Sequence, residues 1–289
     1  MAIIDRVHGT WMGQNPRDAR GSRARGRGGQ ASRSGRPQLA TLVSLALTAV
    51  FGCSNGSVPS GADQALLIEW ANYGGDPGGL KYSPAAEITR NNVAQLRPLW
   101  TWSLGQRGRG RTDAGEEVTA GSFQATPLML GDTLYFSTPF AGAAALDART
   151  GHELWHYDAG GWRWAGPGGR GTFVHRGVAV WSGPDGRRVF LNSRWRMIAL
   201  DAATGKPIES FGSGGEVDLS RDLRWPIHSP DLNSTSPPVI YRDLVIVGSS
   251  ISDDLIHPRD PPGAVLAFDV RSGERRWAWE ALPRPGTPE

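Results

Sequence analysis

The sequence has little cysteine and few extended apolar runs. Its 289 residues include a single cysteine, Cys53, which excludes an internal disulfide framework. Residues 39–51 form an uncharged, mostly apolar run of thirteen, too short to span a bilayer comfortably. The chain is instead rich in turn formers. With 39 glycines and 21 prolines, its composition is typical of a loop-rich all-β protein and not of a helical one.

Excess positive charge is confined to the N-terminal region. The formal net charge is +3, yet residues 1–36 alone hold eight arginines and two aspartates. This segment is rich in Gly, Ser and Arg and cannot bury a core. Its Arg-Gly runs are also typical of RNA-binding segments, but the apolar run that follows indicates an export signal. Nucleic acid is therefore not a predicted partner.

Residues 1–53 are predicted to be a signal peptide. The arginine-rich segment would be an unusually long positive region, or sequence that precedes the true start, and residues 39–51 would be the apolar core. Val50-Phe-Gly-Cys-Ser54 resembles the lipobox of bacterial lipoproteins, whose cysteine is lipidated, although Phe51 departs from the usual small residue. Cys53 is then a lipidation site, or alternatively an incidental thiol. We expect residues 54–64 to be a linker and the chain to reside in the periplasm or cell envelope of a bacterium, with a lipid anchor as its membrane link.

One short phrase occurs three times. Starting at Ala145, Ala199 and Ala267, it reads Ala-Leu-Asp-Ala-Arg-Thr-Gly, Ala-Leu-Asp-Ala-Ala-Thr-Gly and Ala-Phe-Asp-Val-Arg-Ser-Gly. An apolar pair would end a strand, the aspartate would accept bonds from the next backbone amides, and the glycine would supply a positive φ. In two copies, a tryptophan follows the glycine, and these residues, Trp155 and Trp277, are suited to packing between neighbouring sheets.

A hairpin pattern precedes the phrases. Residues 126–136 align without gaps on residues 236–246, and residues 177–192 give a third version with a longer turn. Hairpin plus phrase would make a four-stranded antiparallel sheet. Such sheets repeated along a chain predict a β-propeller, with a β-sandwich as the alternative. Residues 65–289 would hold about four blades, and residues 282–289 read as an inter-blade connection, so we expect an incomplete propeller.

The segment before the first hairpin carries a more specific combination. It contains Tyr73-Gly-Gly-Asp76, Tyr82-Ser-Pro84, Asn92-Val93 and Trp100-Thr-Trp102. Together with the phrases, this closely resembles the N-terminal part of the quinoprotein dehydrogenases, periplasmic eight-bladed propellers that bind pyrroloquinoline quinone (PQQ). The likeness runs from Trp70 to Glu289, and the glucose or polyol branch is the nearest. It implies PQQ held flat in an axial channel, a calcium ion that polarises the quinone carbonyl, and a carboxylate that deprotonates the substrate hydroxyl.

The resemblance also assigns site residues. Residues 123–127, 175–179, 233–238 and 247–254 match family segments that surround the cofactor. The cofactor contacts so implied are Gln124, Arg176, Thr235, Ser249 and Ser250. Arg176 would pair with a PQQ carboxylate, because a planar guanidinium can form two parallel hydrogen bonds with a planar carboxylate.

The remaining assignments concern metal and substrate. Asp253 falls where the family places a calcium-binding carboxylate, with Asp254 beside it, although an Asp-Asp pair is more often a solvated turn. The alcohol-oxidising branch has adjacent cysteines before its arginine. Here His175 precedes Arg176, which favours sugars or polyols. The family's catalytic aspartate lies in a later blade, so we predict no catalytic residue within this chain.

Two functions follow from these patterns. The first is PQQ- and calcium-dependent oxidation of a sugar, polyol or alcohol, with a quinone or cytochrome as electron acceptor and this chain inactive alone. The alternative is a non-catalytic propeller lipoprotein that acts as a protein-interaction scaffold. The polar set Gln124, Arg176, Thr235 and Asp253 discriminates between them, because a scaffold has no reason to keep it.

Overall fold

The computed structural model describes residues 69–164, 174–227, 232–249 and 260–280. The predicted signal peptide, the linker at 54–64 and Cys53 lie outside the described residues. So do Ser250, Asp253 and Asp254. Within the described part, strands dominate, and the helices are three short 3₁₀ turns: η1 (Val93–Gln95), η2 (Gly105–Gly108) and η3 (Gly161–Trp164). This confirms the all-β prediction.

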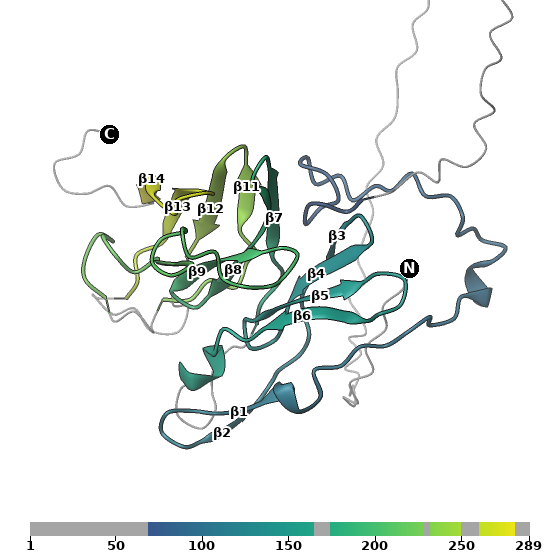
Figure 1. Ribbon diagram of the computed structural model, residues 1–289, viewed down its shortest axis with the longest axis horizontal. Coiled ribbons are helices and arrows are strands. Elements are labelled where there is room, and N and C mark those ends of the chain that lie inside the picture. Colours follow the sequence, from purple (N-terminus) through teal and green to yellow (C-terminus); the bar gives the residue numbers. More distant parts are fainter. Residues whose placement is uncertain (1–68, 165–173, 228–231, 250–259, 281–289) are drawn as a thin grey trace, which may run out of the picture. The chain divides into compact units, whose positions relative to one another are not determined.

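The fold consists of consecutive four-stranded antiparallel sheets (Figure 1). The described residues contain three complete ones, where the length predicted about four, and each runs in chain order from its first strand to its fourth. The first sheet is β3 (Leu128–Leu130), β4 (Thr133–Ser137), β5 (Ala143–Asp147) and β6 (Glu153–Tyr157). The second is β7 (Ala179–Gly183), β8 (Gly186–Ser193), β9 (Arg196–Asp201) and β10 (Glu216–Asp218). The third is β11 (Val239–Tyr241), β12 (Leu244–Gly248), β13 (Ala264–Asp269) and β14 (Arg275–Glu280). A separate two-stranded ribbon pairs β1 (Arg109–Arg111) with β2 (Glu117–Thr119).

In the first and third sheets, each phrase covers the end of the third strand and the turn that leads into the fourth strand. In the second sheet, the phrase covers the end of the third strand and the turn that follows it. In the first sheet, Asp147 Oδ1 accepts the backbone N–H groups of Arg149 at 3.0 Å and Thr150 at 2.7 Å, and the Thr150 hydroxyl at 2.8 Å. The Thr150 hydroxyl is the largest of the influences that lower the pKa of Asp147. Gly151 closes the turn with a φ of 72°, so the predicted turn chemistry is confirmed.

The predicted alignment of the hairpins is wrong by one residue. The carbonyl of Asp132 accepts the N–H of Ala148, and the carbonyl of Asp243 accepts the N–H of Val270 at the same place in its phrase. Asp132 therefore corresponds to Asp243, whereas the alignment of 126–136 on 236–246 pairs Asp132 with Arg242. The strands themselves were placed correctly, and only the correspondence between the two hairpins shifts by one residue.

Two apolar clusters join the sheets. One lies between the first and second sheets, and the other lies between the second and third. Representative fully buried members are Ala145, Leu191, Ile198, Phe190, Phe211 and Val245. A third cluster covers the remaining face of the first sheet, where Trp100, Trp102 and Phe123 pack on Phe136 and Leu146.

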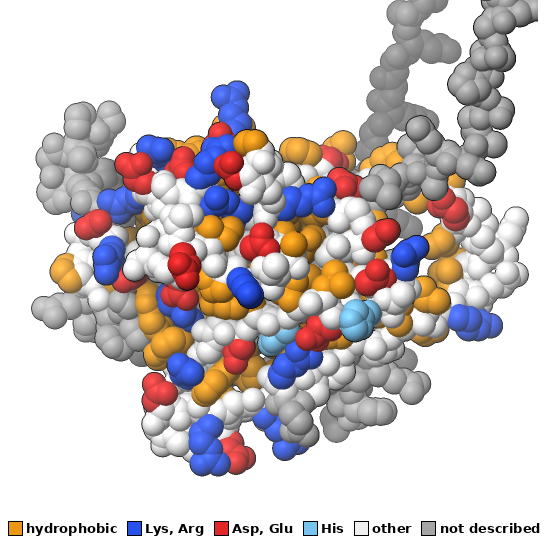
Figure 2. Space-filling view, in the orientation of Figure 1, with side chains coloured by type: hydrophobic (Ala, Val, Ile, Leu, Met, Phe, Trp, Pro, Cys, Tyr) orange, Lys and Arg blue, Asp and Glu red, His pale blue; other side chains and the backbone are white. Residues whose placement is uncertain are grey.

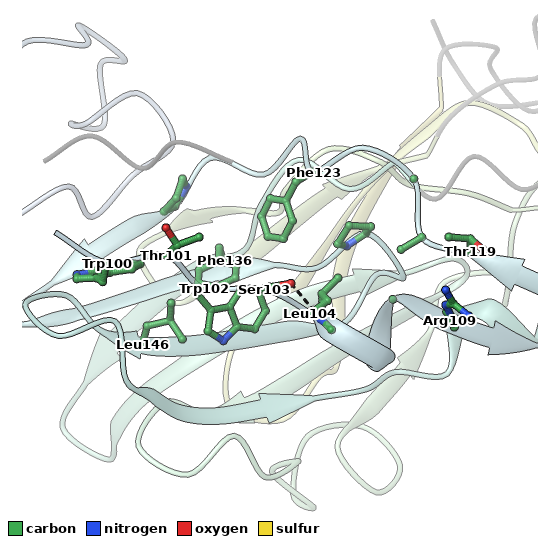
Figure 3. Close-up of a pocket in the computed structure, with 16 residues that line it drawn as sticks. Trp100, Thr101, Trp102, Ser103, Leu104, Arg109, Thr119, Phe123, Phe136 and Leu146 are labelled. Atoms are coloured by element: carbon green, nitrogen blue, oxygen red, sulfur yellow. Dashed lines mark hydrogen bonds between the residues drawn. The ribbon is translucent and has the colours of Figure 1, made fainter. Parts of the chain in front are cut away.

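This third cluster also lines a cavity (Figure 3). Trp102, Phe123 and Phe136 meet there with ring centroids 5.3 to 6.5 Å apart. The segment that contributes Trp100 and Trp102 thus shields the free face of the first sheet from water. On the molecular face drawn in Figure 2, basic and acidic side chains are interspersed among apolar ones, so both signs of charge share this surface.

Candidate functional site

The segments that enter the first strand of each sheet are bonded to one another. Thr126, just before β3, donates its backbone N–H to the carbonyl of Arg176 at 3.0 Å. Arg176, just before β7, donates its own N–H to the carbonyl of Thr235, just before β11, at 3.0 Å. Three segments that lie 50 and 59 residues apart in sequence are therefore brought to one place by main-chain bonds, which fix their mutual positions without depending on side chains.

Arg176 is held at this junction by its side chain as well. Its Nη1 donates to Thr235 Oγ1 at 2.5 Å, while the side chain as a whole remains exposed. One end of the guanidinium is thus oriented by the hydroxyl, and among the described residues no other side-chain hydrogen bond engages it. A planar cation with free donors in a fixed direction can accept a carboxylate in a two-bond fork.

The other predicted cofactor contacts differ in their placement. Gln124 is exposed and precedes Thr126 by two residues, so it belongs to the segment bonded to Arg176. Ser249 is engaged within the third sheet: its Oγ donates to the carbonyl of Pro262 at 3.2 Å and accepts the N–H of Ala264 at 3.1 Å. The structure thus brings Arg176 and Thr235 into contact, and it places Gln124 on the segment whose Thr126 is hydrogen-bonded to Arg176. Ser250, Asp253 and Asp254 lie outside the described residues, so their roles stay predictions.

A buried polar network lies behind this junction and was not predicted from the sequence. Asn192, at the end of β8, donates through Nδ2 to Ser234 Oγ at 3.2 Å and to the carbonyl of Ser236 at 2.9 Å. Ser234 Oγ donates in turn to the carbonyl of Gly248 at 2.7 Å. The network connects the second sheet to the third through the segment that carries Thr235. The one available sequence signal was that Asn192 directly follows the apolar run of residues 189–191 in β8.

His175 supports Arg176 from the interior. Its ring is only 3% exposed, and its Nδ1 accepts the N–H of Gly177 at 3.5 Å. Burial lowers its pKa to about 4; the backbone carbonyl of Asn192 opposes that shift and the charge of Arg176 adds to it. His175 is therefore neutral near pH 7 and places no second positive charge beside the guanidinium.

We expect this histidine to make stability pH-dependent. The unfolded chain binds a proton at His175 near pH 6.5, the folded chain only near pH 4, so the unfolded state is favoured progressively as the pH falls between these values. The group should cost up to about 3 kcal/mol of unfolding free energy across that window. Denaturant unfolding from pH 7.5 to 4 should show this decline, and His175→Gln should flatten it. Equal slopes in both proteins would contradict the assignment.

Two further observations concern metals and membranes. In the described ranges, no three His, Cys, Asp or Glu side chains gather as they would around a metal ion. None of the helices in the described part of the chain has the length and apolar character that a membrane span requires.

Comparison with known proteins matches the chain to one family. The model of the glucose/ethanol/alcohol dehydrogenase β-propeller domain, a PQQ domain, matches residues 70–289. Curated relatives include quinate/shikimate dehydrogenase (quinone) of Acinetobacter baylyi, 30% identical over 74% of this chain and 28% of the relative. Quinoprotein glucose dehydrogenase of Escherichia coli is 31% identical over 78% of this chain and 29% of the relative.

A solved structure agrees with this result. Quinohemoprotein alcohol dehydrogenase from Comamonas testosteroni superposes with a TM-score of 0.59 at 28% identity, over 76% of this chain and 28% of that protein. The chain therefore spans less than a third of the length of the relatives that it matches.

Proposed function

This chain belongs to the glucose/ethanol/alcohol dehydrogenase β-propeller family, and we propose that it contributes cofactor-binding side chains to a PQQ-dependent oxidation of a sugar, polyol or related alcohol. The observation that carries the proposal is the contact between Arg176 and Thr235 at the place where the three sheets are bonded together. The names of the relatives describe dehydrogenases, which favours an enzymatic role over an interaction scaffold.

The described residues fit part of such a cofactor site. A bound PQQ, which is a planar acid, would supply the acceptor for hydride from the substrate carbon. Arg176 would hold one of its carboxylates, and the Thr235 hydroxyl would keep the guanidinium in a fixed position for that contact. Gln124 would add a neutral donor and acceptor from the neighbouring segment. Because His175 is neutral, it would add no second positive charge to that of Arg176.

The remaining parts of the proposal rest on the sequence. Asp253 and Asp254 would supply hard oxygens for calcium. His175 in place of the cysteines favours a sugar or polyol, and a quinone or cytochrome would take the electrons. The signal-like residues 1–53 support a location in the bacterial cell envelope, with Cys53 as the lipid attachment. The catalytic base would come from residues outside this chain, so the chain alone should not oxidise substrate.

The test is cofactor binding, measured by equilibrium dialysis of PQQ against the purified chain with calcium. Arg176→Ala should weaken binding at least about tenfold, because a charge-assisted fork is lost. Arg176→Lys should recover only part of it, because a lysine cannot form the fork. Arg149→Ala removes an exposed arginine from the turn between β5 and β6 and serves as the matched control.

Two results would contradict the proposal. If Arg176→Ala bound PQQ as well as the unchanged chain, with the same unfolding midpoint, Arg176 would not hold the cofactor. If the unchanged chain with PQQ and calcium reduced an artificial electron acceptor with glucose, the catalytic base would have to lie within these residues.

A further inference from the structure

Asn192 holds both neighbours of Thr235 with a single amide group. Its Nδ2 donates to Ser234 Oγ at 3.2 Å and to the carbonyl of Ser236 at 2.9 Å. Thr235 lies between these two residues, and its own hydroxyl accepts the bond from Arg176 Nη1. Because the two bonds act on either side of Thr235, they restrain both ends of this short piece of backbone.

The chemistry of the two acceptors explains why an asparagine occupies this position. A backbone carbonyl can only accept, so Ser236 requires a donor. Ser234 Oγ gives its own hydrogen to the carbonyl of Gly248 at 2.7 Å, so toward Asn192 it can only accept as well. The position therefore needs one group with two hydrogens. An amide nitrogen supplies both, a hydroxyl supplies one, and a carboxylate supplies none.

The burial of Asn192 shows that its amide is not kept for packing. The residue is 0% exposed, and its Oδ1 has no hydrogen-bond partner among the described residues. A buried acceptor without a partner costs free energy, and such an atom in a native protein calls for an explanation. A leucine of similar size would avoid this cost. The amide is explained by the two bonds that its nitrogen makes.

The backbone of Asn192 reaches the other partner of the Arg176–Thr235 contact. Its carbonyl lies beside the buried ring of His175, where it opposes the lowering of the pKa of that ring. His175 directly precedes Arg176 in the sequence. One residue of β8 therefore contacts the residue before Arg176 and the residues on both sides of Thr235. The two segments are joined to each other by the main-chain bond between Arg176 and Thr235 at 3.0 Å.

We propose that Asn192 is a positioning residue of the candidate cofactor site. It fixes the place of Thr235 from the interior, and the Thr235 hydroxyl in turn fixes the direction of the Arg176 guanidinium. This inference rests on the proposed function, in which Arg176 holds a PQQ carboxylate. Since Asn192 is fully buried, it acts on a ligand only through Thr235 and Arg176.

The first test needs no cofactor. In the chain isotope-labelled at its threonine methyl groups, NMR reports the surroundings of the Thr235 methyl, whose signal is identified by its loss in Thr235→Ser. Asn192→Leu removes both donors at similar size, and it should shift or broaden this signal. Asn192→Ser keeps one donor, and it should cause a smaller change.

The second test is PQQ binding, measured by equilibrium dialysis with calcium. Asn192→Leu should weaken binding at least about tenfold, because the guanidinium is no longer held in place for the carboxylate. In a Thr235→Val background, Asn192→Leu should add little, since both changes act on the same contact.

Met197→Val is the matched control. Met197 lies opposite Asn192 on β9, is equally buried and belongs to the cluster between the second and third sheets. Its side chain has no hydrogen-bond donor, so it cannot hold the segment of Thr235. Met197→Val should lower the unfolding midpoint and leave both the Thr235 signal and the PQQ affinity unchanged.

The outcomes separate this proposal from the proposed function. If Asn192→Leu leaves the Thr235 signal unchanged, Asn192 does not position Thr235. If Asn192→Leu and Met197→Val have equal effects at equal unfolding midpoints, the amide contributes stability alone, and the proposal is wrong. If the Thr235 signal moves but even the unchanged chain binds no PQQ, Asn192 still holds Thr235, and it is the proposed function that fails. Asn192→Ser, the milder change, carries the same comparisons if Asn192→Leu does not fold.

Discussion

Replacing Trp155 by alanine should lower the free energy of unfolding by about 3–5 kcal/mol. The side chain is 8% exposed and packs in the cluster between the first and second sheets. Its removal leaves a large cavity between two sheets and leaves the carbonyl of Ala202 without the indole donor. The loss should fall on the contact between sheets, because the β5–β6 ladder does not depend on this side chain.

Urea unfolding of the purified chain, followed by circular dichroism, measures this effect. Trp279→Ala is the matched control, since the same residue type is removed from the outer strand of another sheet at 59% exposure. It should change the unfolding free energy by no more than about 0.5 kcal/mol. Similar losses in the two variants would mean that Trp155 is not an inter-sheet anchor.

The repeat made the fold predictable, because its signals are local. An aspartate that caps its own turn and a glycine with positive φ act within four or five residues, so Asp147 and Gly151 could be assigned without the structure. The register of the hairpins was harder. Leu128-Met-Leu130 and Val239-Ile-Tyr241 are apolar without alternation, and a strand that lacks alternation does not indicate which face is buried. Only the pairing of each hairpin with the phrase that follows it determines which face of the strand is buried.

The site was predictable only in part, for the opposite reason. Arg176 and Thr235 were assigned by resemblance, but their contact joins residues 59 positions apart and could not be derived from either segment. His175 carries no local sign that it is buried, and Asn192 has only the apolar run that precedes it in β8. A histidine beside an arginine usually faces water, and the network that includes Asn192 exists only once the second and third sheets meet. Long-range burial, not residue type, determines what these polar groups do.

The contact between the Trp155 ring and Gly205 of the second phrase can also be tested by changing the glycine. Gly205→Ala should cost about 2–4 kcal/mol of unfolding free energy. The added Cβ would lie 2.6 Å from the Trp155 ring, and the backbone has a φ of 70°, which disfavours any residue but glycine. The indole must shift, and its bond to the carbonyl of Ala202 weakens with it.

The matched control separates the two causes. Gly131→Ala introduces the same methyl group at a φ of 60° in the β3–β4 turn, where nothing lies within 4 Å. It should cost only about 1 kcal/mol, the backbone penalty alone. In the Trp155→Ala background, Gly205→Ala should fall to that same value, because the ring it meets is gone and the two changes are then coupled. If Gly205→Ala costs the same with and without Trp155, backbone strain alone explains the glycine, and the indole does not require it.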